Sequence, residues 1–219
     1  MAGVTHIGFI GGTGPEGKGL AYRFALAGHE IVIGSRNRER AETAASEIGE
    51  RVAKAAVRGV ENADAARDGE LIVLTVPFAA QADTLPALRD AVGGKVVVST
   101  AVPLSFEGGR LSMLAVPEGS AAEQAQALLP NARVVGAFQN LGAAKLWDGD
   151  ALMEQDVIVC GDDADAKREV MALAEQIRGA RAVDGGPLAS SRYVEGITAL
   201  LVAINRRHKT LAGVRIVGV

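Results

Sequence analysis

Short apolar runs alternate along the chain with stretches that are rich in alanine and charged residues. Several of the apolar runs contain no alternating polar residue, which is typical of strands buried on both faces of a parallel sheet. The pattern predicts an α/β fold with a doubly wound, mostly parallel sheet and a small C-terminal helical lobe. The expected strands are residues 7–10, 31–33, 53–57, 71–76, 95–99, 133–137 and 157–160.

Helices are expected at residues 15–27 and 38–48. Another should begin at residues 185–187, because the proline of this Gly-Gly-Pro break suits the first turn of a helix. Residues 103–119 are expected to be irregular. We place a boundary near residue 165, between a larger domain of residues 1–165 and a C-terminal lobe of residues 166–219. In this late helix, apolar residues recur at helical spacing at Val194, Ile197, Leu201 and Ile204. Core packing or a dimer contact would explain this apolar face.

Composition and charge narrow the range of functions. The chain has 219 residues, a net charge of −3 and 4% aromatic residues, so neither nucleic acid nor a membrane surface is an expected partner. The one cysteine, Cys160, is expected to be a buried strand residue of a protein in a reducing compartment. His6, His29 and His208 lack ligand spacing, so no metal site is expected. No signal-peptide pattern or membrane-spanning run is visible, so the expected location is the cytoplasm.

A glycine-rich loop stands between the first expected strand and the first expected helix. This context makes the GxGxxG pattern informative and predicts a Rossmann-type dinucleotide-binding domain in residues 1–165. We expect Gly12 to permit the tight turn, Gly14 to let a pyrophosphate approach the backbone, and Gly17 to let the helix pack against the strand. Free N–H groups at the helix start would face the anion. The loop residues predicted to contact the cofactor are Gly12, Thr13, Gly14, Pro15, Glu16 and Gly17.

The end of the second expected strand indicates which dinucleotide binds. An NAD enzyme usually carries an acidic residue there, which accepts a hydrogen bond from the ribose 2′-hydroxyl. Here Ser35 and Arg36 follow the strand, and Glu30 lies at its opposite end. The Arg36 guanidinium suits a 2′-phosphate, Ser35 can donate to it, and Arg40 can close over it one helical turn later. The sequence therefore favours NADP over NAD.

Motifs along nearly the whole chain resemble one family. The matching segments are residues 11–14, 19–21, 27–30, 34–36, 74–78, 102–104, 120–123, 159–163, 186–188 and 192–195. Together they strongly resemble the NADPH:coenzyme F420 oxidoreductases. The early segments are shared with many Rossmann reductases, and the late ones are more specific to this family.

The resemblance implies a homodimer that exchanges a hydride between NADP(H) and the deazaflavin coenzyme F420. It also implies two groups of site residues. The adenosine and phosphate half of NADP would be held by residues 13–16 together with Ser35, Arg36 and Arg40. The nicotinamide and deazaflavin would be bordered by Phe78, Val102 and Ala143.

Two positions depart from the family pattern. Members often carry a histidine in the turn after the strand at residues 133–137, where this chain has Gln139. Thr100 stands where a proline is expected. Reducing the deazaflavin builds negative charge at its N1–C2=O edge, and we expect Gln139 or backbone N–H groups to donate hydrogen bonds there. No Ser-His-Asp or Cys-His set is visible, and hydride exchange between two organic carriers needs none.

Two other functions stay open at this point. One is an NADPH-dependent reductase of the same fold that acts on another acceptor, such as a flavin, a pterin or an imine; Gln139 is its main support. The other is a non-catalytic NADP-sensing protein, because a fold does not fix a function. Turnover distinguishes the sensor from both enzymes, and acceptor screening distinguishes the enzymes from each other.

Overall fold

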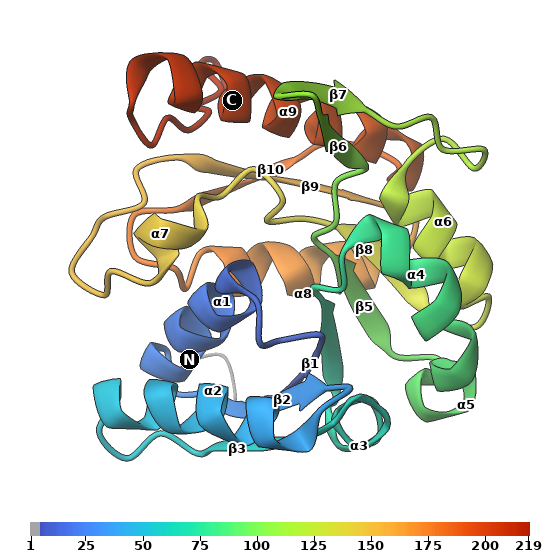
Figure 1. Ribbon diagram of the computed structural model, residues 1–219, viewed down its shortest axis with the longest axis vertical. Coiled ribbons are helices and arrows are strands. Elements are labelled where there is room, and N and C mark those ends of the chain that lie inside the picture. Colours follow the sequence, from blue (N-terminus) through green and yellow to red (C-terminus); the bar gives the residue numbers. More distant parts are fainter. Residues whose placement is uncertain (1–4) are drawn as a thin grey trace.

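The predicted α/β class is confirmed by a computed structural model, which describes residues 5–219. Residues 1–4 of the predicted first domain lie outside the described range. The main sheet has eight strands in the order β10-β9-β8-β5-β4-β1-β2-β3, and its strands pair in parallel except at β8–β9 (Figure 1). The strands are β1 (His6–Ile10), β2 (Glu30–Ser35), β3 (Val57–Glu61), β4 (Leu71–Leu74), β5 (Val96–Ser99), β8 (Arg133–Gly136), β9 (Asp156–Gly161) and β10 (Arg181–Asp184).

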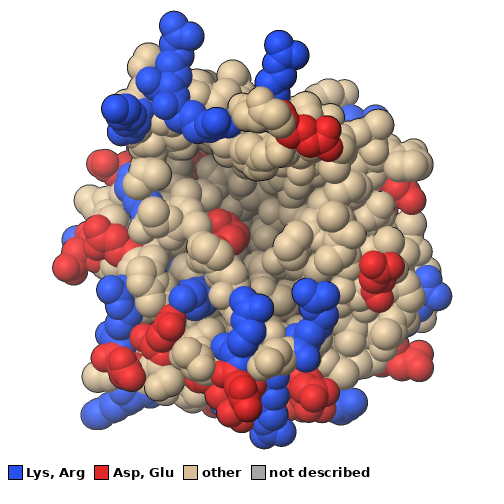
Figure 2. Space-filling view, viewed as in Figure 1, with Lys and Arg blue, Asp and Glu red and all other residues tan. Residues whose placement is uncertain are grey.

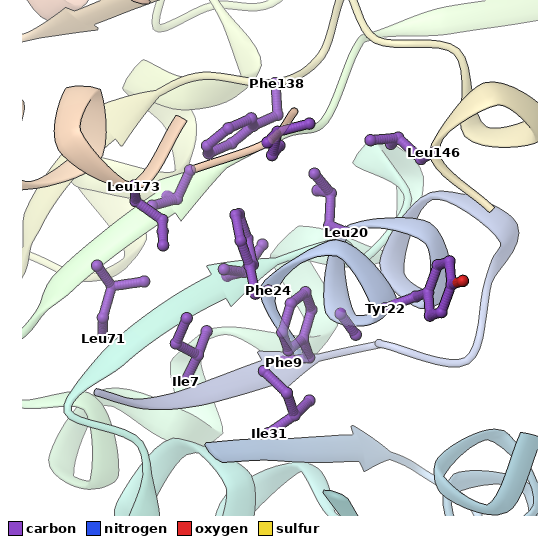
Figure 3. Close-up of a cluster of buried hydrophobic side chains, with 14 of the residues drawn as sticks. Ile7, Phe9, Leu20, Tyr22, Phe24, Ile31, Leu71, Phe138, Leu146 and Leu173 are labelled. Carbon is purple, nitrogen blue, oxygen red and sulfur yellow. The ribbon is translucent and has the colours of Figure 1, made fainter. Parts of the chain in front are cut away.

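Helices cover both faces of this sheet, as the apolar runs predicted. On one face, Ile7 and Phe9 of β1 share a core with α1, α2, α7 and α8, part of which is shown in Figure 3. On the other face, Ile10 and Leu74 pack with α3, α5 and α6. The helices are α1 (Pro15–Leu26), α2 (Arg38–Arg51), α3 (Asn62–Asp68), α4 (Phe78–Thr84), α5 (Arg89–Val92), α6 (Ala121–Leu128), α7 (Ala143–Leu146), α8 (Ala164–Ala174) and α9 (Ser191–His208).

Three predicted elements need correction. The strand expected at residues 53–57 begins only at Val57, because Lys54 takes a left-handed turn with φ 66° and β3 then runs to Glu61. Residues 103–119 contain an antiparallel hairpin, β6 (Leu104–Glu107) and β7 (Arg110–Met113), rather than irregular chain only. The helix expected at residues 185–187 begins at Ser191, after a 3₁₀ turn.

The C-terminal part of the chain extends the same sheet. The predicted boundary at residue 165 falls at the start of α8, and β9 and β10 lie on either side of it in one continuous sheet. The division into two domains stays a prediction. Cys160 is fully buried in β9, as expected, and burial raises the pKa of its thiol to about 11. Within residues 5–219, no helix combines the length and apolarity needed to cross a membrane.

Candidate functional site

The glycine-rich loop joins β1 to α1 at the carboxyl edge of the sheet. The tight turn that we predicted at Gly12 is made by Gly11, whose φ of 77° favours glycine. Gly12 is limited instead by packing, because a Cβ there would lie 2.7 Å from the Phe9 Cβ. Gly17, predicted to let the helix pack against the strand, packs against the loop: its Cβ would lie 2.8 Å from the Gly12 Cα. The loop is therefore held tightly against the strand.

Gly14 leaves room for a ligand at the start of α1. No atom in residues 5–219 other than its chain neighbours lies within 4 Å of the position that a Cβ would take there. Gly14 is the N-cap and Pro15 is the first helical residue. Helical hydrogen bonding begins with the Lys18 N–H, which donates to the Gly14 carbonyl at 2.9 Å. The N–H groups of Glu16 and Gly17 are then oriented toward an anion above the helix start.

A cavity of about 390 Å³ opens beside this loop. It brings together Ser35, Arg36 and Arg40, as the sequence predicted, with Thr13 and Gly14 of the loop. Figure 2 shows that this face of the molecule is hollowed and that Lys and Arg side chains stand along the lower side of the hollow. The further lining residues, which were not predicted, are Gly11, Asn37, Asn62, Thr75, Val76, Pro77, Ala80 and Thr84.

The start of α2 presents the two predicted arginines to that cavity. The Asn37 side chain caps the helix by accepting from the Arg40 N–H at 3.0 Å. Arg38 forms an ion pair with Glu42 at 2.9 Å, whereas Arg36 and Arg40 are exposed and form no ion pair within the described part of the chain. Two cations are therefore available for a phosphate.

Two residues outside the predicted set shape the loop. The Asn62 Oδ1, at the start of α3, accepts from the Gly11 N–H at 3.1 Å and fixes the turn. Asn62 is buried, with 8% of its surface exposed. Ser35 is also buried, and its Oγ accepts from the Asn37 N–H at 3.2 Å, so its hydroxyl hydrogen is free to be donated. An asparagine that begins a helix after a strand is only a weak sequence signal, which is why Asn62 was missed.

The carboxyl group of Glu16 has an unusual environment and a shifted pKa at this site. Its residue surface is partly exposed, but its Oε1 is buried and has no hydrogen-bond partner in residues 5–219. Burial raises the pKa of the Glu16 carboxyl to about 8. A neutral carboxylic acid therefore lies in the phosphate loop at neutral pH.

The residues predicted for the second substrate lie at one edge of the sheet, beyond that cavity. Phe78 follows β4, Val102 follows β5 and Gln139 follows β8, and these three strands are neighbours. Ala143 begins α7. None of the four lines the cavity beside the loop. The sheet therefore places them at its carboxyl edge, and their joint contact with a substrate stays a prediction.

Gln139 sits in a tightly constrained turn. Phe138 has a φ of 68°, which is uncommon for a bulky residue, and its ring is fully buried against Phe24, with the centroids 5.7 Å apart. The Thr198 hydroxyl donates to the Gln139 carbonyl at 3.1 Å. The Gln139 amide is buried, with 5% of the residue exposed, and neither of its polar atoms is paired within the described chain. These atoms could pair only with a ligand or with water.

Thr100 has a structural role that explains why this chain carries no proline there. Both its N–H and its hydroxyl donate to the Leu74 carbonyl, at 3.3 and 3.2 Å. These bonds join the ends of β5 and β4, and a proline would lack both donors. As for metals, residues 5–219 hold no cluster of three or more potential His, Cys, Asp or Glu ligands.

The fold and the site are those of a Rossmann-type, NADP-dependent oxidoreductase. The family model described as "NADP oxidoreductase coenzyme F420-dependent" matches residues 6–103. The chain is 42% identical over 217 residues to the F420-dependent NADP reductase of Methanocaldococcus jannaschii, covering 96% of this chain and 97% of that protein. It belongs to the family of coenzyme F420-dependent NADP oxidoreductases, which confirms the resemblance seen in the sequence.

Two further comparisons agree with this assignment. The F420-dependent NADP reductase of Methanothermobacter thermautotrophicus is 41% identical over 220 residues, which cover 97% of this chain and 95% of that protein. A crystal structure from Arthrobacter sp. FB24, described as that of a candidate F420-dependent NADP reductase, superposes with a TM-score of 0.83. It is 27% identical and covers 98% of this chain and 99% of its own. The likeness therefore extends to the C-terminal helix.

Proposed function

We propose that the protein transfers a hydride between NADP(H) and the deazaflavin coenzyme F420. The observation that carries this proposal is the identity of about 40% to named F420-dependent NADP reductases over nearly the full length of both chains. The cavity beside the phosphate loop supports the NADP half, because it combines an open helix N-terminus with two arginines that have no ion-pair partner in residues 5–219.

The residues of the loop and of α2 divide the binding of NADP between them. The α1 N-terminus and the open space at Gly14 receive the pyrophosphate, while Ser35, Arg36 and Arg40 hold the 2′-phosphate. Gly12, Thr13, Pro15 and Gly17 keep the loop in shape. The nicotinamide and the deazaflavin supply the hydride chemistry when both are bound.

Other residues of the chain orient the nicotinamide and the deazaflavin for hydride transfer. Phe78, Val102 and Ala143 form the walls of the site for the nicotinamide and the deazaflavin, and their apolar surfaces exclude water. Gln139 donates a hydrogen bond toward the N1–C2=O edge of the deazaflavin. Its buried, unpaired amide supports this role.

We propose further that the protein is a homodimer that acts in the cytoplasm and binds no nucleic acid. Exposed apolar side chains on α9 and the β6–β7 hairpin support a dimer, since Tyr193, Leu200 and Phe106 are 70%, 60% and 60% exposed. Figure 1 shows α9 beside β6 and β7 at one end of the molecule. Light scattering tests the dimer: Leu200→Glu should shift the mass to that of one chain, and a single-chain mass for the wild type would contradict it.

The activity is tested by mixing the protein with NADPH and oxidised coenzyme F420 and following the loss of deazaflavin absorbance. Rapid, protein-dependent loss is expected. Flavins, pterins and cyclic imines are offered in parallel as acceptors. Rapid turnover of one of these, without turnover of coenzyme F420, would overturn the substrate assignment, and no turnover of any acceptor with intact NADPH binding would favour an NADP-sensing protein.

A further inference from the structure

Residues 196–219, which form most of α9 and the chain after it, contain cations but no acid. They hold four Arg or Lys residues and no Asp or Glu, although the whole chain has 26 acidic and 23 basic residues. All four are exposed, and none forms an ion pair within residues 5–219. They are Arg206, Arg207, Lys209 and Arg215. The C-terminal end of α9 is thus a basic surface on a slightly acidic protein.

The α9 helix passes directly beside the turn that contains Gln139. The Thr198 hydroxyl donates to the Gln139 carbonyl at 3.1 Å. Arg206 and Lys209 come 8 and 11 residues after Thr198. At a rise of 1.5 Å per residue, they lie about 12 and 17 Å farther along the helix axis. The basic end of α9 is therefore within the length of a small ligand from the expected deazaflavin site.

The helical spacing separates these cations into two groups. Residues at i+4 and i+7 return to one face of a helix, so Arg206 and Lys209 follow Thr198 on the side of α9 that contacts the Gln139 turn. Arg207 lies instead seven residues after the exposed Leu200, on the opposite side. Arg207 is therefore a natural internal control, because it belongs to the same helix turn but faces another way.

The chain after α9 returns to the Gln139 turn by a second route. The Asn140 side chain, in that turn, donates to the Asp156 carbonyl at 2.7 Å. The Asp156 N–H donates to the Val214 carbonyl at 2.8 Å, and its Oδ2 accepts from the Ile216 N–H at 2.6 Å. Arg215 lies between these two contacts and is exposed. Two separate segments thus bring cations near one turn, and the helix dipole, which acts within the last turn of α9, does not account for Arg215.

The surface view shows basic residues on two sides of the hollow. One row of Lys and Arg side chains stands along its lower side, and another group gathers at the upper left, over the C-terminal end of α9 (Figures 1 and 2). Arg36 and Arg40, which line the cavity beside the loop, account for the 2′-phosphate of NADP in the proposed function. The cations at the end of α9 are not needed for NADP, so they are available to the second substrate.

Coenzyme F420 carries its negative charge away from its ring. Its deazaflavin bears a ribityl chain that continues through a phosphodiester and a lactyl group into γ-linked glutamates. With the ring beside Gln139, the phosphodiester and the first carboxylates are within reach of the end of α9. Guanidinium and ammonium groups bind such oxygens through charge-assisted hydrogen bonds.

We propose that Arg206, Lys209 and Arg215, the basic cluster, bind the anionic tail of coenzyme F420 and select the tailed coenzyme over a bare deazaflavin. This assignment rests on the proposed function. Exposed ion pairs contribute little each, up to about fivefold in affinity for one cation, and salt screens them. The basic cluster therefore adds affinity and specificity for the tail, while the hydride is transferred elsewhere.

The first test measures binding without turnover. With NADP⁺ present, so that no hydride is available, deazaflavin fluorescence is titrated for coenzyme F420 and for the ribityl deazaflavin that lacks the phosphate and the tail. The wild type should prefer coenzyme F420 at low salt, and the preference should shrink as the salt concentration rises. A triple variant, Arg206→Gln with Lys209→Gln and Arg215→Gln, should lose about tenfold of this preference. Arg207→Gln, the matched control, should keep it.

The second test separates binding from chemistry. The triple variant should raise the KM for coenzyme F420 by about tenfold at low salt, with kcat and the KM for NADPH within about twofold of the wild type. A version with lysine at positions 206 and 215 keeps the charges and should retain the wild-type KM. An unchanged KM in the triple variant would overturn the proposal, as would an equal loss for the two deazaflavins or an equal loss in Arg207→Gln. A triple variant of single-chain mass with unchanged tail preference would assign the cations to a dimer contact instead.

The two proposals can fail separately. If the wild type does not reduce coenzyme F420 but binds it with a tail preference that the triple variant loses, the basic cluster stands and the proposed function fails. If the wild type and the triple variant reduce coenzyme F420 with the same KM, the proposed function stands and the role of the basic cluster is refuted. A wild type that neither binds nor reduces coenzyme F420 refutes both.

Discussion

Removing the Arg36 guanidinium tests how the protein distinguishes NADP from NAD. Arg36 is exposed, forms no ion pair within residues 5–219 and lines the cavity beside the loop. Its replacement by alanine therefore breaks no ion pair in this part of the chain, and the loss is expected to fall on binding. A hydrogen bond to a charged group contributes about 1.5–3 kcal/mol. Arg36→Ala should weaken NADPH binding by about 10- to 150-fold, at one tenfold step for each 1.4 kcal/mol.

The control and the assay follow from the same helix start. Arg38 is two residues away and is held by Glu42 at 2.9 Å, so Arg38→Ala should leave NADPH affinity nearly unchanged. For each protein, fluorescence titration with NADPH and with NADH, at low and at physiological salt, gives four affinities to compare. NADH affinity should be the same in both variants, because it lacks the 2′-phosphate. A parallel fall in NADH and NADPH affinity would refute the reasoning.

The remaining predictions concern the loop, the second substrate and stability. Gly14→Val should obstruct the pyrophosphate and weaken NADPH binding by about 1–3 kcal/mol in a titration, with an unchanged circular dichroism spectrum. Gln139→Ala should slow hydride transfer by roughly tenfold in stopped-flow absorbance without changing NADPH affinity. Asp156→Asn should lower the free energy of unfolding by about 2 kcal/mol in urea, because it removes the charge that faces the part-exposed Arg181. The Arg181 hydrogen bond and the Ile216 N–H lower the pKa of the Asp156 carboxyl, so its stabilisation is present at neutral pH and disappears as the pH falls below about 4.

Strands could be predicted from the sequence where their hydrophobic pattern matches their burial in the folded protein. Residues 7–10 of β1 and 96–98 of β5 form unbroken apolar runs because helices cover both faces of the sheet, so the hydrophobic pattern located these strands. β3 was misplaced because it is an edge strand with Arg58 and Glu61 at exposed positions. Gly59 also hides its strand character, although its Cβ would clash with the α2 backbone at 2.2 Å from the Ala41 carbonyl carbon.

The site was predictable where its residues are neighbours in sequence. The glycine loop and the Ser35-Arg36 pair are local motifs, and the cavity joins them. The contacts that were missed join distant segments: Asn62 accepts from Gly11 across 51 positions, and Thr100 donates to Leu74 across 26. The packing of α1 at Gly19 likewise depends on α7, which begins more than a hundred residues later, since a Cβ at Gly19 would lie 2.7 Å from the Leu146 Cβ. No local pattern contains that information.

The charge state of Glu16 also determines how an acid is tolerated beside a phosphate-binding helix start. An ionised carboxylate there would repel the negative charge of a bound pyrophosphate and so oppose binding. Burial avoids this repulsion, because it raises the pKa of Glu16 to about 8 and keeps the group neutral at physiological pH. The sign of the pH effect follows: the protonated form binds NADP(H) better, so affinity falls as the pH rises through 8. A glutamine at position 16, which carries no charge at any pH, should therefore preserve NADP(H) binding at high pH.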